Sequence, residues 1–291
     1  MLVGIDCGHG MNTSGKRTPL LTQDLIIGGK ILRKKGECIH EFEWNIGVGK
    51  YLATALKRNN IDYIYLMDTT GKIDTPLATR AKKANDNNCD IVVSNHYNAY
   101  GSCSKFLDES KYKGGLLVLR TQNCSQKSIT LGTYIDNALN DDIDYSYNYG
   151  LRKDVDISGF TLAILRQTNM PAVLIEYGFM DLWKEAKLML DTNFQKKCAE
   201  ATCKGICKYF GITYKKETTT QNNVVNQIIT LDQLNIRKVA DWNATAITTV
   251  KKGQYLDVVE KVDAKNGTTK MYKLESGLYI TASEKYVKVV K

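Results

Sequence analysis

The stretch "MLVGIDCGHG" (residues 1–10) decides the fold class, because it joins a short apolar run directly to a glycine-rich turn. Leu2 to Asp6 is predicted to form a buried strand, and Gly8-His9-Gly10 is predicted to turn the chain sharply after it. In open α/β sheets, functional sites form outside the carboxyl ends of the strands. His9 is therefore the first candidate site residue.

The next residues, "GMNTSGKRT" (10–18), come close to the pattern of a phosphate-binding loop. Such a loop needs a serine or threonine directly after its lysine, and it must open a helix. Here Arg17 follows Lys16, and Pro19 disfavours helical geometry at Thr18. A phosphate site is therefore not expected.

Residues 2 to 211 repeat this alternation of short apolar runs with amphipathic helices, which is typical of an α/β sheet. We predict a twisted, mostly parallel sheet flanked by helices. The expected strands are Leu2–Asp6, Tyr63–Met67, Ile91–Ser94, Gly115–Leu119 and Ala172–Glu176. The expected helices span about 41–59, 76–87, 128–139, 185–190 and 193–210.

The composition changes after residue 213. "KKETTTQNNVVNQ" (215–227) is polar and has no period, which predicts a linker over 214–229. Residues 230–291 carry short alternating segments separated by glycine and Asn-Gly turns, which predict a small all-β barrel. The predicted organisation is a domain over 1–213, the linker, and a second domain over 230–291.

The 291 residues carry a net charge of +9, which suits an anionic partner. Nucleic acid is not expected, because there is no RNP motif, zinc-finger spacing or basic helix. No apolar run approaches the roughly 18 residues of a membrane span. The start of the chain lacks a basic signal-peptide region, so we expect synthesis in the cytoplasm without a signal peptide. The eight cysteines are accordingly expected to be reduced thiols. Charge and composition leave the oligomeric state open.

The three histidines of the chain, His9, His40 and His96, all lie in the predicted first domain. "IVVSNHYNA" (91–99) places His96 at the end of an apolar strand, as His9 is placed at the end of another. "IHEFEWN" (39–45) begins a helix with two glutamates, Glu41 and Glu43. Taken singly, a histidine at a strand end is often structural, and an acid in the first turn of a helix is favoured by the helix dipole.

Glu176 ends the apolar strand in "MPAVLIEYGFM" (170–180), where a charge needs a partner, which could simply be a basic side chain. Together the residues are more specific. Two imidazoles and one carboxylate supply three ligands and leave a fourth tetrahedral position open, as in catalytic zinc sites. A further glutamate nearby is what such a site needs as a general base.

Four segments carry a family resemblance: "GIDCGHG…GKRTP", "EFEWNIGVGKYL", "TRAKKANDNNCDIVVSNHYNA" and "MPAVLIEYGFM". In this order, across residues 1 to 213, they resemble the zinc-dependent N-acetylmuramoyl-L-alanine amidases (amidase type 3), in particular the phage-endolysin branch. The resemblance implies hydrolysis of the amide between N-acetylmuramic acid and L-alanine in peptidoglycan. It also implies zinc held by His9, Glu41 and His96, with Glu176 as the acid/base.

The family has an asparagine four residues after the ligand glutamate, so Asn45 favours Glu41 over Glu43; a three-histidine site that includes His40 is the alternative. The loop from Leu20 to Cys38 departs from the family, as does Leu182, where an asparagine is usual. For Asn98, contact with substrate and capping of a turn remain equally open.

Residues 234–291 resemble a bacterial SH3-like domain through "LNIRKVADWNATAITTVKKGQYLDVV" and "GLYITASEKYVKVV". This resemblance implies binding to the cell wall, with peptidoglycan and its associated wall polymer as partners. Action on the wall is then expected after release through holin pores or by cell lysis. Two rival functions are a zinc peptidase cutting the stem peptide and a non-catalytic wall-binding protein.

Overall fold

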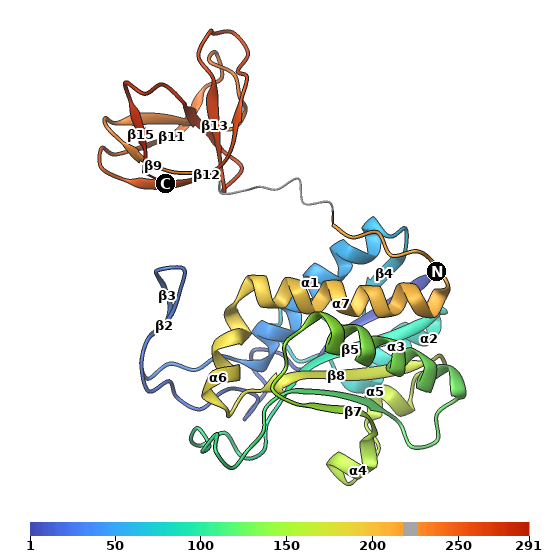
Figure 1. Cartoon of the computed structure of the whole chain (residues 1–291). Coiled ribbons are helices and arrows are strands. Elements are labelled where there is room, and N and C mark those ends of the chain that lie inside the picture. The colour runs from blue at the N-terminus through green and yellow to red at the C-terminus, as the bar shows by residue number, and fades with distance from the viewer. Residues whose placement is uncertain (218–225, 291) are drawn as a thin grey trace. The chain divides into compact units, whose positions relative to one another are not determined.

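The structure, a computed structural model, describes residues 1–217 and 226–290. The chain divides into two compact units, Met1–Lys216 and Glu217–Lys291 (Figure 1). Each unit has its own hydrophobic core and is described by itself below.

The first unit is built on a six-stranded sheet with the order β4-β1-β5-β8-β6-β7. Its central strands are almost entirely buried and apolar, as expected for a sheet that is covered on both faces. The strands are β1 (Leu2–Cys7), β4 (Asp62–Tyr65), β5 (Ile91–Asn98), β6 (Leu116–Arg120), β7 (Asn148–Lys153) and β8 (Ala172–Phe179).

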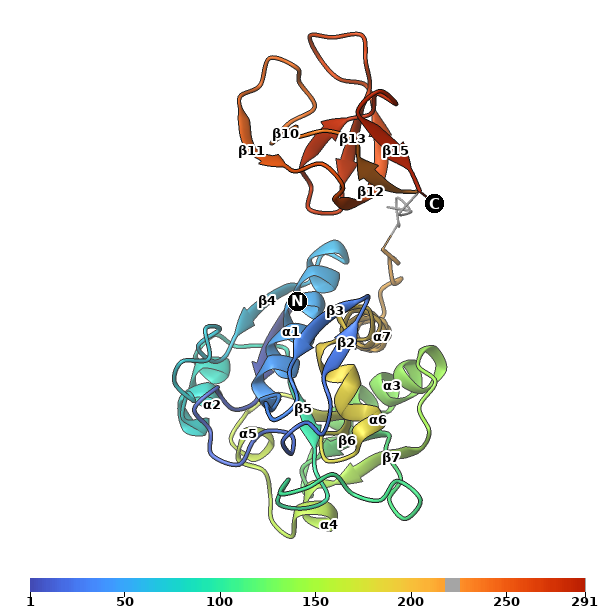
Figure 2. The ribbon, with the colours of Figure 1, turned by 90° about the vertical axis from the view of Figure 1, so that its left-hand side faces the viewer.

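Helices cover both faces of this sheet (Figures 1 and 2). Helices α1, α3 and α7 contribute side chains to the larger core on one face, and α2 and α5 contribute to the smaller core on the other. The helices are α1 (Glu41–Arg58), α2 (Leu77–Asp86), α3 (Gln126–Asp142), α4 (Asp154–Ser158), α5 (Ala163–Arg166), α6 (Trp183–Ala186), the 3₁₀ helix η1 (Lys187–Leu190) and α7 (Thr192–Phe210).

Strand direction determines which segments meet at one edge of the sheet. β4, β1, β5 and β8 run parallel, whereas β6 runs antiparallel to β8 and parallel to β7. The carboxyl ends of β1, β5 and β8 therefore share an edge with the starts of β6 and β7. The prediction of a mostly parallel sheet with flanking helices is confirmed, with this one change of direction.

The structure corrects the sequence prediction in three places. β5 continues to Asn98, so His96 and Asn98 lie within the strand instead of after it. Strand β7 was not predicted, because it is an edge strand with a mainly polar, half-exposed sequence. The segment predicted as an irregular loop contains a hairpin of β2 (Leu25–Ile27) and β3 (Lys30–Arg33) that pairs with no other strand.

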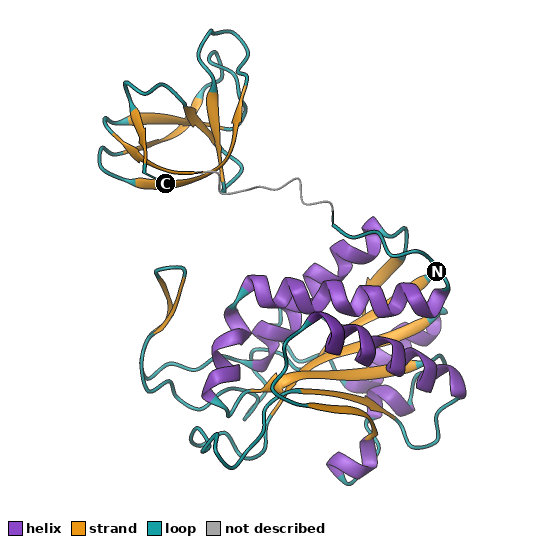
Figure 3. Ribbon diagram, in the orientation of Figure 1, coloured by secondary structure: helices purple, strands orange, loops and turns teal. Residues whose placement is uncertain are grey.

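The second unit is all-β over its described residues (Figure 3). Its seven-stranded sheet has the order β11-β10-β14-β13-β12-β9-β15 and encloses a small apolar core. The strands are β9 (Asn226–Thr230), β10 (Leu234–Arg237), β11 (Ala246–Val250), β12 (Tyr255–Val262), β13 (Met271–Leu274), β14 (Tyr279–Thr281) and β15 (Val287–Val289).

Strand β9 lies where the sequence predicted the end of the linker. Asparagine and glutamine have low strand propensity, so "NNVVNQ" gave no strand signal. Pairing with both β12 and β15 nevertheless places 226–230 inside the sheet. The linker predicted over 214–229 therefore ends before β9 begins at residue 226. Its central part, 218–225, lies outside the described residues.

Two further features bear on the expected surroundings of the chain. All eight cysteines lie in the described part and are free thiols, which agrees with the prediction. Among the helices of the described ranges, none combines the length and the apolar character needed to cross a bilayer.

Candidate metal centre

Three separate segments bring His9, Glu41 and His96 together at the carboxyl edge of the first sheet. His9 follows β1, Glu41 is the first residue of α1, and His96 lies near the end of β5. Glu41 lies between the imidazoles: His9 Nε2 is 3.3 Å from its Oε2, and His96 Nδ1 is 2.9 Å from its Oε1. One potential ligand atom from each residue lies within 4.8 Å of the other two.

The backbone at His9 is held in a conformation that residues other than glycine adopt only uncommonly. Its φ angle is 63°, in the left-handed region. The guanidinium of Arg80 donates hydrogen bonds to the carbonyls of Cys7 (2.7 Å) and His9 (3.0 Å). Gly8 is required beside it, because a Cβ there would overlap the imidazole of His96. The turn thus brings the two imidazoles into edge-to-face contact, with ring centroids 5.0 Å apart.

Arg80 is itself fixed by carboxylates. It is 1% exposed, and it pairs with Asp6 at 2.7 Å and with Asp74 at 2.6 Å. The other oxygen of Asp6 accepts a hydrogen bond from Ser94 of β5. This buried network joins β1, β5 and α2 directly beneath the turn that carries His9.

One carboxylate oxygen of Glu41 is fixed by hydrogen bonds, whereas the other accepts none. Its Oε1 accepts hydrogen bonds from the backbone N–H of Tyr97 (3.2 Å) and from Asn45 Nδ2 (3.4 Å), and Asn45 also bonds the carbonyl of Gly8 (3.0 Å). Its Oε2 is buried and has no hydrogen-bond partner. Burying a carboxylate oxygen that accepts no hydrogen bond costs free energy unless a cation binds that oxygen.

The electrostatics of the cluster favour an anionic Glu41 and a neutral His9. Burial alone would raise the pKa of Glu41, but the neighbouring His9 and His96 outweigh it and lower that pKa to about 2. Burial lowers the pKa of His9 to about 4, against the attraction of Glu41. Burial also opposes protonation of His96, but its contact with Glu41 leaves the pKa raised.

Glu176 lies next to this cluster on β8, where it is the register partner of His96. Its Oε2 is buried and has no hydrogen-bond partner. Burial raises the pKa of Glu176 to about 7, and the charge of Glu41 adds to the rise while that of His96 opposes it. A carboxyl group with a pKa near neutrality can both take up and release a proton at neutral pH.

The other predicted candidates lie outside the cluster. Glu43 forms an ion pair with Arg33, and its Oε2 accepts a hydrogen bond from the backbone N–H of His40. Over the described residues, the group of side chains that could hold a metal ion contains neither His40 nor Glu43. Asn98 is the last residue of β5, and its side chain accepts a hydrogen bond from the N–H of Ala99.

Sequence reasoning missed Arg80, one of two cations near the cluster. Arg80 lies on a helix of mostly polar residues, so the local sequence gives no sign that its side chain is buried; the acidic Asp6 inside the apolar strand β1 was the available signal. Lys16, from the segment that resembled a phosphate loop, places its Nζ 3.9 Å from Glu41 Oε2. It adds positive charge at the open side of the cluster.

Comparison with known proteins identifies the family of the first unit. The sequence profile of the N-acetylmuramoyl-L-alanine amidases matches residues 3–208, which include the three clustered residues and Glu176. The chain belongs to this amidase family. The predicted family resemblance is thereby confirmed for the first unit.

A curated relative of this amidase-family chain is an endolysin of Bacillus phage SPP1, which is 31% identical over 301 residues and is matched over 99% of this chain and 98% of its own length. The amidase AmiC of Neisseria meningitidis serogroup B is 22% identical, and the match covers 74% of this chain and 54% of AmiC. Family membership and the full-length endolysin homologue support peptidoglycan hydrolysis, as predicted.

Solved amidase structures share the fold of the first unit. An N-acetylmuramoyl-L-alanine amidase from Clostridium difficile 630 superposes with a TM-score of 0.57 at 24% identity, covering 72% of this chain and 96% of that one. AmiC2 of Nostoc punctiforme gives a TM-score of 0.55 at 25% identity, with 72% and 97% covered. Residues 219–287 match a family described as a domain of unknown function.

Proposed function

We propose that the chain is a zinc-dependent amidase that cleaves the bond between N-acetylmuramic acid and L-alanine, with the metal held by His9, Glu41 and His96. One observation carries the proposal: three segments distant in sequence place two imidazoles around a carboxylate whose buried Oε2 accepts no hydrogen bond. Two nitrogen donors and one oxygen donor form a set that zinc accepts in catalytic sites. The residues present therefore fit the ion.

Zinc bound there would supply Lewis acidity, which polarises the substrate carbonyl and makes water a stronger nucleophile at neutral pH. Glu176 is proposed as the group that moves the proton. Its free, buried Oε2 takes a proton from the attacking water. It then delivers this proton to the alanine nitrogen as the C–N bond breaks, which regenerates the carboxylate.

Metal analysis of single variants tests the ligand assignment. His9→Ala and His96→Ala are expected to lose bound zinc, measured per chain after dialysis, together with activity on cell walls. His40→Ala is the matched control, because the structure places that imidazole outside the cluster, and it should keep both. If purified enzyme kept clearing cell-wall suspensions after complete zinc removal by a chelator, the proposed metal dependence would be wrong.

The products identify the bond. Mass spectrometry of digested peptidoglycan should find intact stem peptides with a free alanine amine, and glycan strands that have lost them. Shortened stem peptides would instead identify a zinc peptidase. A protein that binds walls and releases neither product would be non-catalytic.

We also propose that residues 1–213 form the catalytic domain and that the second unit, from β9 onward, is an SH3-like module that binds the wall. Support comes from the separate apolar core of the second unit and from the endolysin homologue, which matches over the full chain. Residues 1–216 alone should keep activity on a soluble muramoyl-peptide and should bind purified walls more weakly than the full chain. Equal wall binding by both would contradict the role of the second unit.

As with an endolysin, the proposed place of action is the cell wall, reached after holin-type release or cell lysis. Expression inside a bacterial host with and without a co-expressed holin tests this route. Lysis is expected with the holin, and lysis of equal speed without it would contradict the proposal.

A further inference from the structure

A continuous group of aromatic rings lies at the same edge of the first sheet as the candidate metal centre. We call it the tyrosine platform, and it consists of Tyr100, Tyr112, Tyr147, Tyr149 and Phe179. The ring centroids of Tyr100 and Phe179 are 4.4 Å apart, and those of Tyr149 and Phe179 are 5.8 Å apart. Tyr112 and Tyr147 extend the group, 5.0 Å from Tyr100 and 4.7 Å from Tyr149 respectively.

Strand order places the platform directly beside the catalytic residues. Phe179 ends β8 three residues after Glu176, which corresponds to about 10 Å along a strand. Tyr100 follows β5 by two residues, and Asn98 of β5 is the register partner of Phe179. Tyr147 and Tyr149 lie at the start of β7, two strands beyond β8 in the sheet. The rings thus lead away from the metal centre along one sheet edge.

The platform combines exposure with rigidity. Tyr100 is 41% exposed, Tyr112 is 39% exposed and Tyr147 is 40% exposed, whereas Phe179 is buried beneath the Tyr100 ring at an interplanar angle of 17°. The hydroxyls of Tyr100 and Tyr149 lie next to each other, and each is within hydrogen-bond distance of the carbonyl of Lys113 (2.7 and 2.8 Å), so their two protons can make two of these three bonds at a time. Rings held in place lose little freedom when a ligand binds, which favours affinity.

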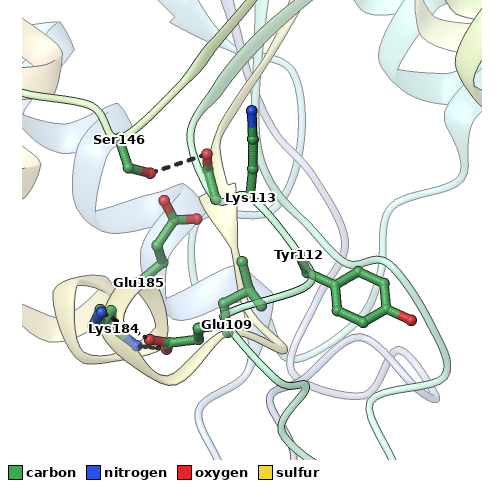
Figure 4. A pocket seen from close by; sticks show the side chains of 8 residues that line it. Glu109, Tyr112, Lys113, Ser146, Lys184 and Glu185 are labelled. Carbon is green, nitrogen blue, oxygen red and sulfur yellow. Dashed lines mark hydrogen bonds and ion pairs between the residues drawn. The ribbon is translucent and has the colours of Figure 1, made fainter.

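A recess borders the platform (Figure 4). It has a volume of about 220 Å³, and it offers carboxylate, hydroxyl and ammonium groups beside the apolar side chain of Leu182. Figure 4 shows the ring of Tyr112 projecting away from Glu185, so this ring borders the recess without filling it. The residues that line the recess are Glu109, Tyr112, Lys113, Gly114, Ser146, Leu182, Lys184 and Glu185.

We propose that the tyrosine platform binds a sugar of the glycan strand next to the muramoyl unit whose amide is cleaved. This inference rests on the proposed function, in which the scissile bond joins a sugar polymer to a peptide. A pyranose ring presents a flat face of C–H bonds that packs on an aromatic face, and its hydroxyl and acetamido groups need polar partners. The platform supplies the aromatic faces and the recess supplies the polar groups. A peptide offers such flat apolar faces only through aromatic side chains, so it fits this surface less well.

The distance from Glu176 makes the proposal testable with soluble substrates. At about 10 Å along the strand, the platform lies beyond the sugar that carries the scissile bond. Two substrates with the same peptide are therefore compared, one with a single muramoyl sugar and one with a four-sugar glycan. For Tyr100→Ala, we expect a loss of about 10-fold in kcat/KM, mainly through KM, on the four-sugar substrate and no change on the single-sugar substrate.

Two variants serve as controls. Tyr100→Phe retains the stacking ring and should stay near the wild-type value on both substrates. Tyr134→Ala removes a half-buried tyrosine on α3 whose ring packs against Lys208, and it should change neither rate. An equal loss on both substrates for Tyr100→Ala would mean that the ring only supports the metal centre, and would overturn the proposal. Unchanged rates of Tyr100→Ala on both substrates would also overturn the proposal.

A binding measurement keeps the proposal separate from the proposed catalysis. Calorimetry with a peptide-free four-sugar glycan needs no turnover, and Tyr100→Ala should weaken this binding by about 10-fold. If the full-length protein bound the glycan in this way but cleaved neither substrate, the amidase proposal would fail and the sugar site would stand. If the affinity depended on the length of an added peptide and not on the number of sugars, the platform would be a peptide site and the proposal would be wrong.

Discussion

The two units differ in what they bury. The first unit encloses charged side chains, among them Asp6, Glu41 and Arg80, each about 1% exposed. In the described part of the second unit, the buried polar residues are the two threonines Thr230 and Thr281. Burying a charge is costly unless it is paired, so a fold keeps such groups where they are held by partners or needed for chemistry. The buried charges, and with them the candidate metal centre, thus lie in the first unit.

Removing the proton-moving carboxyl should produce the largest effect. Glu176→Gln is expected to lower kcat/KM on a soluble muramoyl-peptide by roughly 10² to 10⁴-fold, because general acid/base groups contribute about that much. Bound zinc and wall binding should be unchanged, since neither the metal ligands nor the second unit is altered. If Glu176→Gln turned over substrate at a near-normal rate, Glu176 would not be the acid/base. The buried charge of the first unit would then be less closely tied to catalysis.

The buried ion network should give the next largest effect. Arg80→Met leaves Asp6 buried without its cation, and breaking a buried pair in this way costs about 3–5 kcal/mol of unfolding free energy. Denaturant unfolding is expected to shift only the transition of the first unit. Arg120→Met is the matched control, because this half-buried arginine bonds only neighbouring groups along its own chain segment, and it should cost far less.

Glu185 should make the stability of the first unit depend on pH. Burial, aided by the charges of Glu109 and Asp181 and opposed by hydrogen bonds from two backbone N–H groups, raises the pKa of Glu185 from 4.5 to about 7. The folded state then retains a proton that the unfolded state releases between these values, so stability falls as pH rises through this window, by at most about 3 kcal/mol.

Glu185→Gln tests this dependence, because it removes the titrating group. The melting temperature of the metal-free first unit, measured every half pH unit from 4 to 8, should fall less for Glu185→Gln than for the wild type. Parallel curves for the two proteins would show that the carboxyl titrates normally.

The smallest of these effects is expected in the second unit. A Cβ on Gly267 would overlap the indole ring of Trp242, so Gly267→Ala forces the ring to shift and costs about 1–3 kcal/mol. Only the second unfolding transition should move, and cleavage of a soluble substrate should stay unchanged. A parallel loss of that activity would mean that the second unit contributes to catalysis. Gly253→Ala is a poor control, because its φ of 81° adds strain of its own.

Strands could be predicted from the sequence where an apolar run is also buried in the fold. The apolar runs at β1, β5 and β8 are buried on both faces. The polar ends of these strands place His9, His96, Asn98 and Glu176 at one edge of the sheet. Edge strand β7 and strand β9 escaped prediction, because their polar sequences depend on pairing partners that lie far away in the chain.

The supporting parts of the site were harder to predict for the same reason. Arg80 lies in a helix of mostly polar residues, and only the fold reveals that its side chain enters the interior to reach Asp6. The tyrosine platform collects rings from segments near residues 100, 112, 147 and 179, which lie far apart in the sequence. Such groups are defined by sheet order, which no single stretch of sequence encodes.

The left-handed backbone at His9 has an evolutionary consequence. Asparagine and glycine adopt a φ near 63° more readily than histidine does, so the chain retains at position 9 a residue that its own geometry disfavours. The metal ligation proposed for His9 would oppose that preference, because it needs the imidazole. A homologue that keeps the surrounding network but carries asparagine or glycine at position 9 is expected to bind no zinc, which metal analysis of that purified homologue would check.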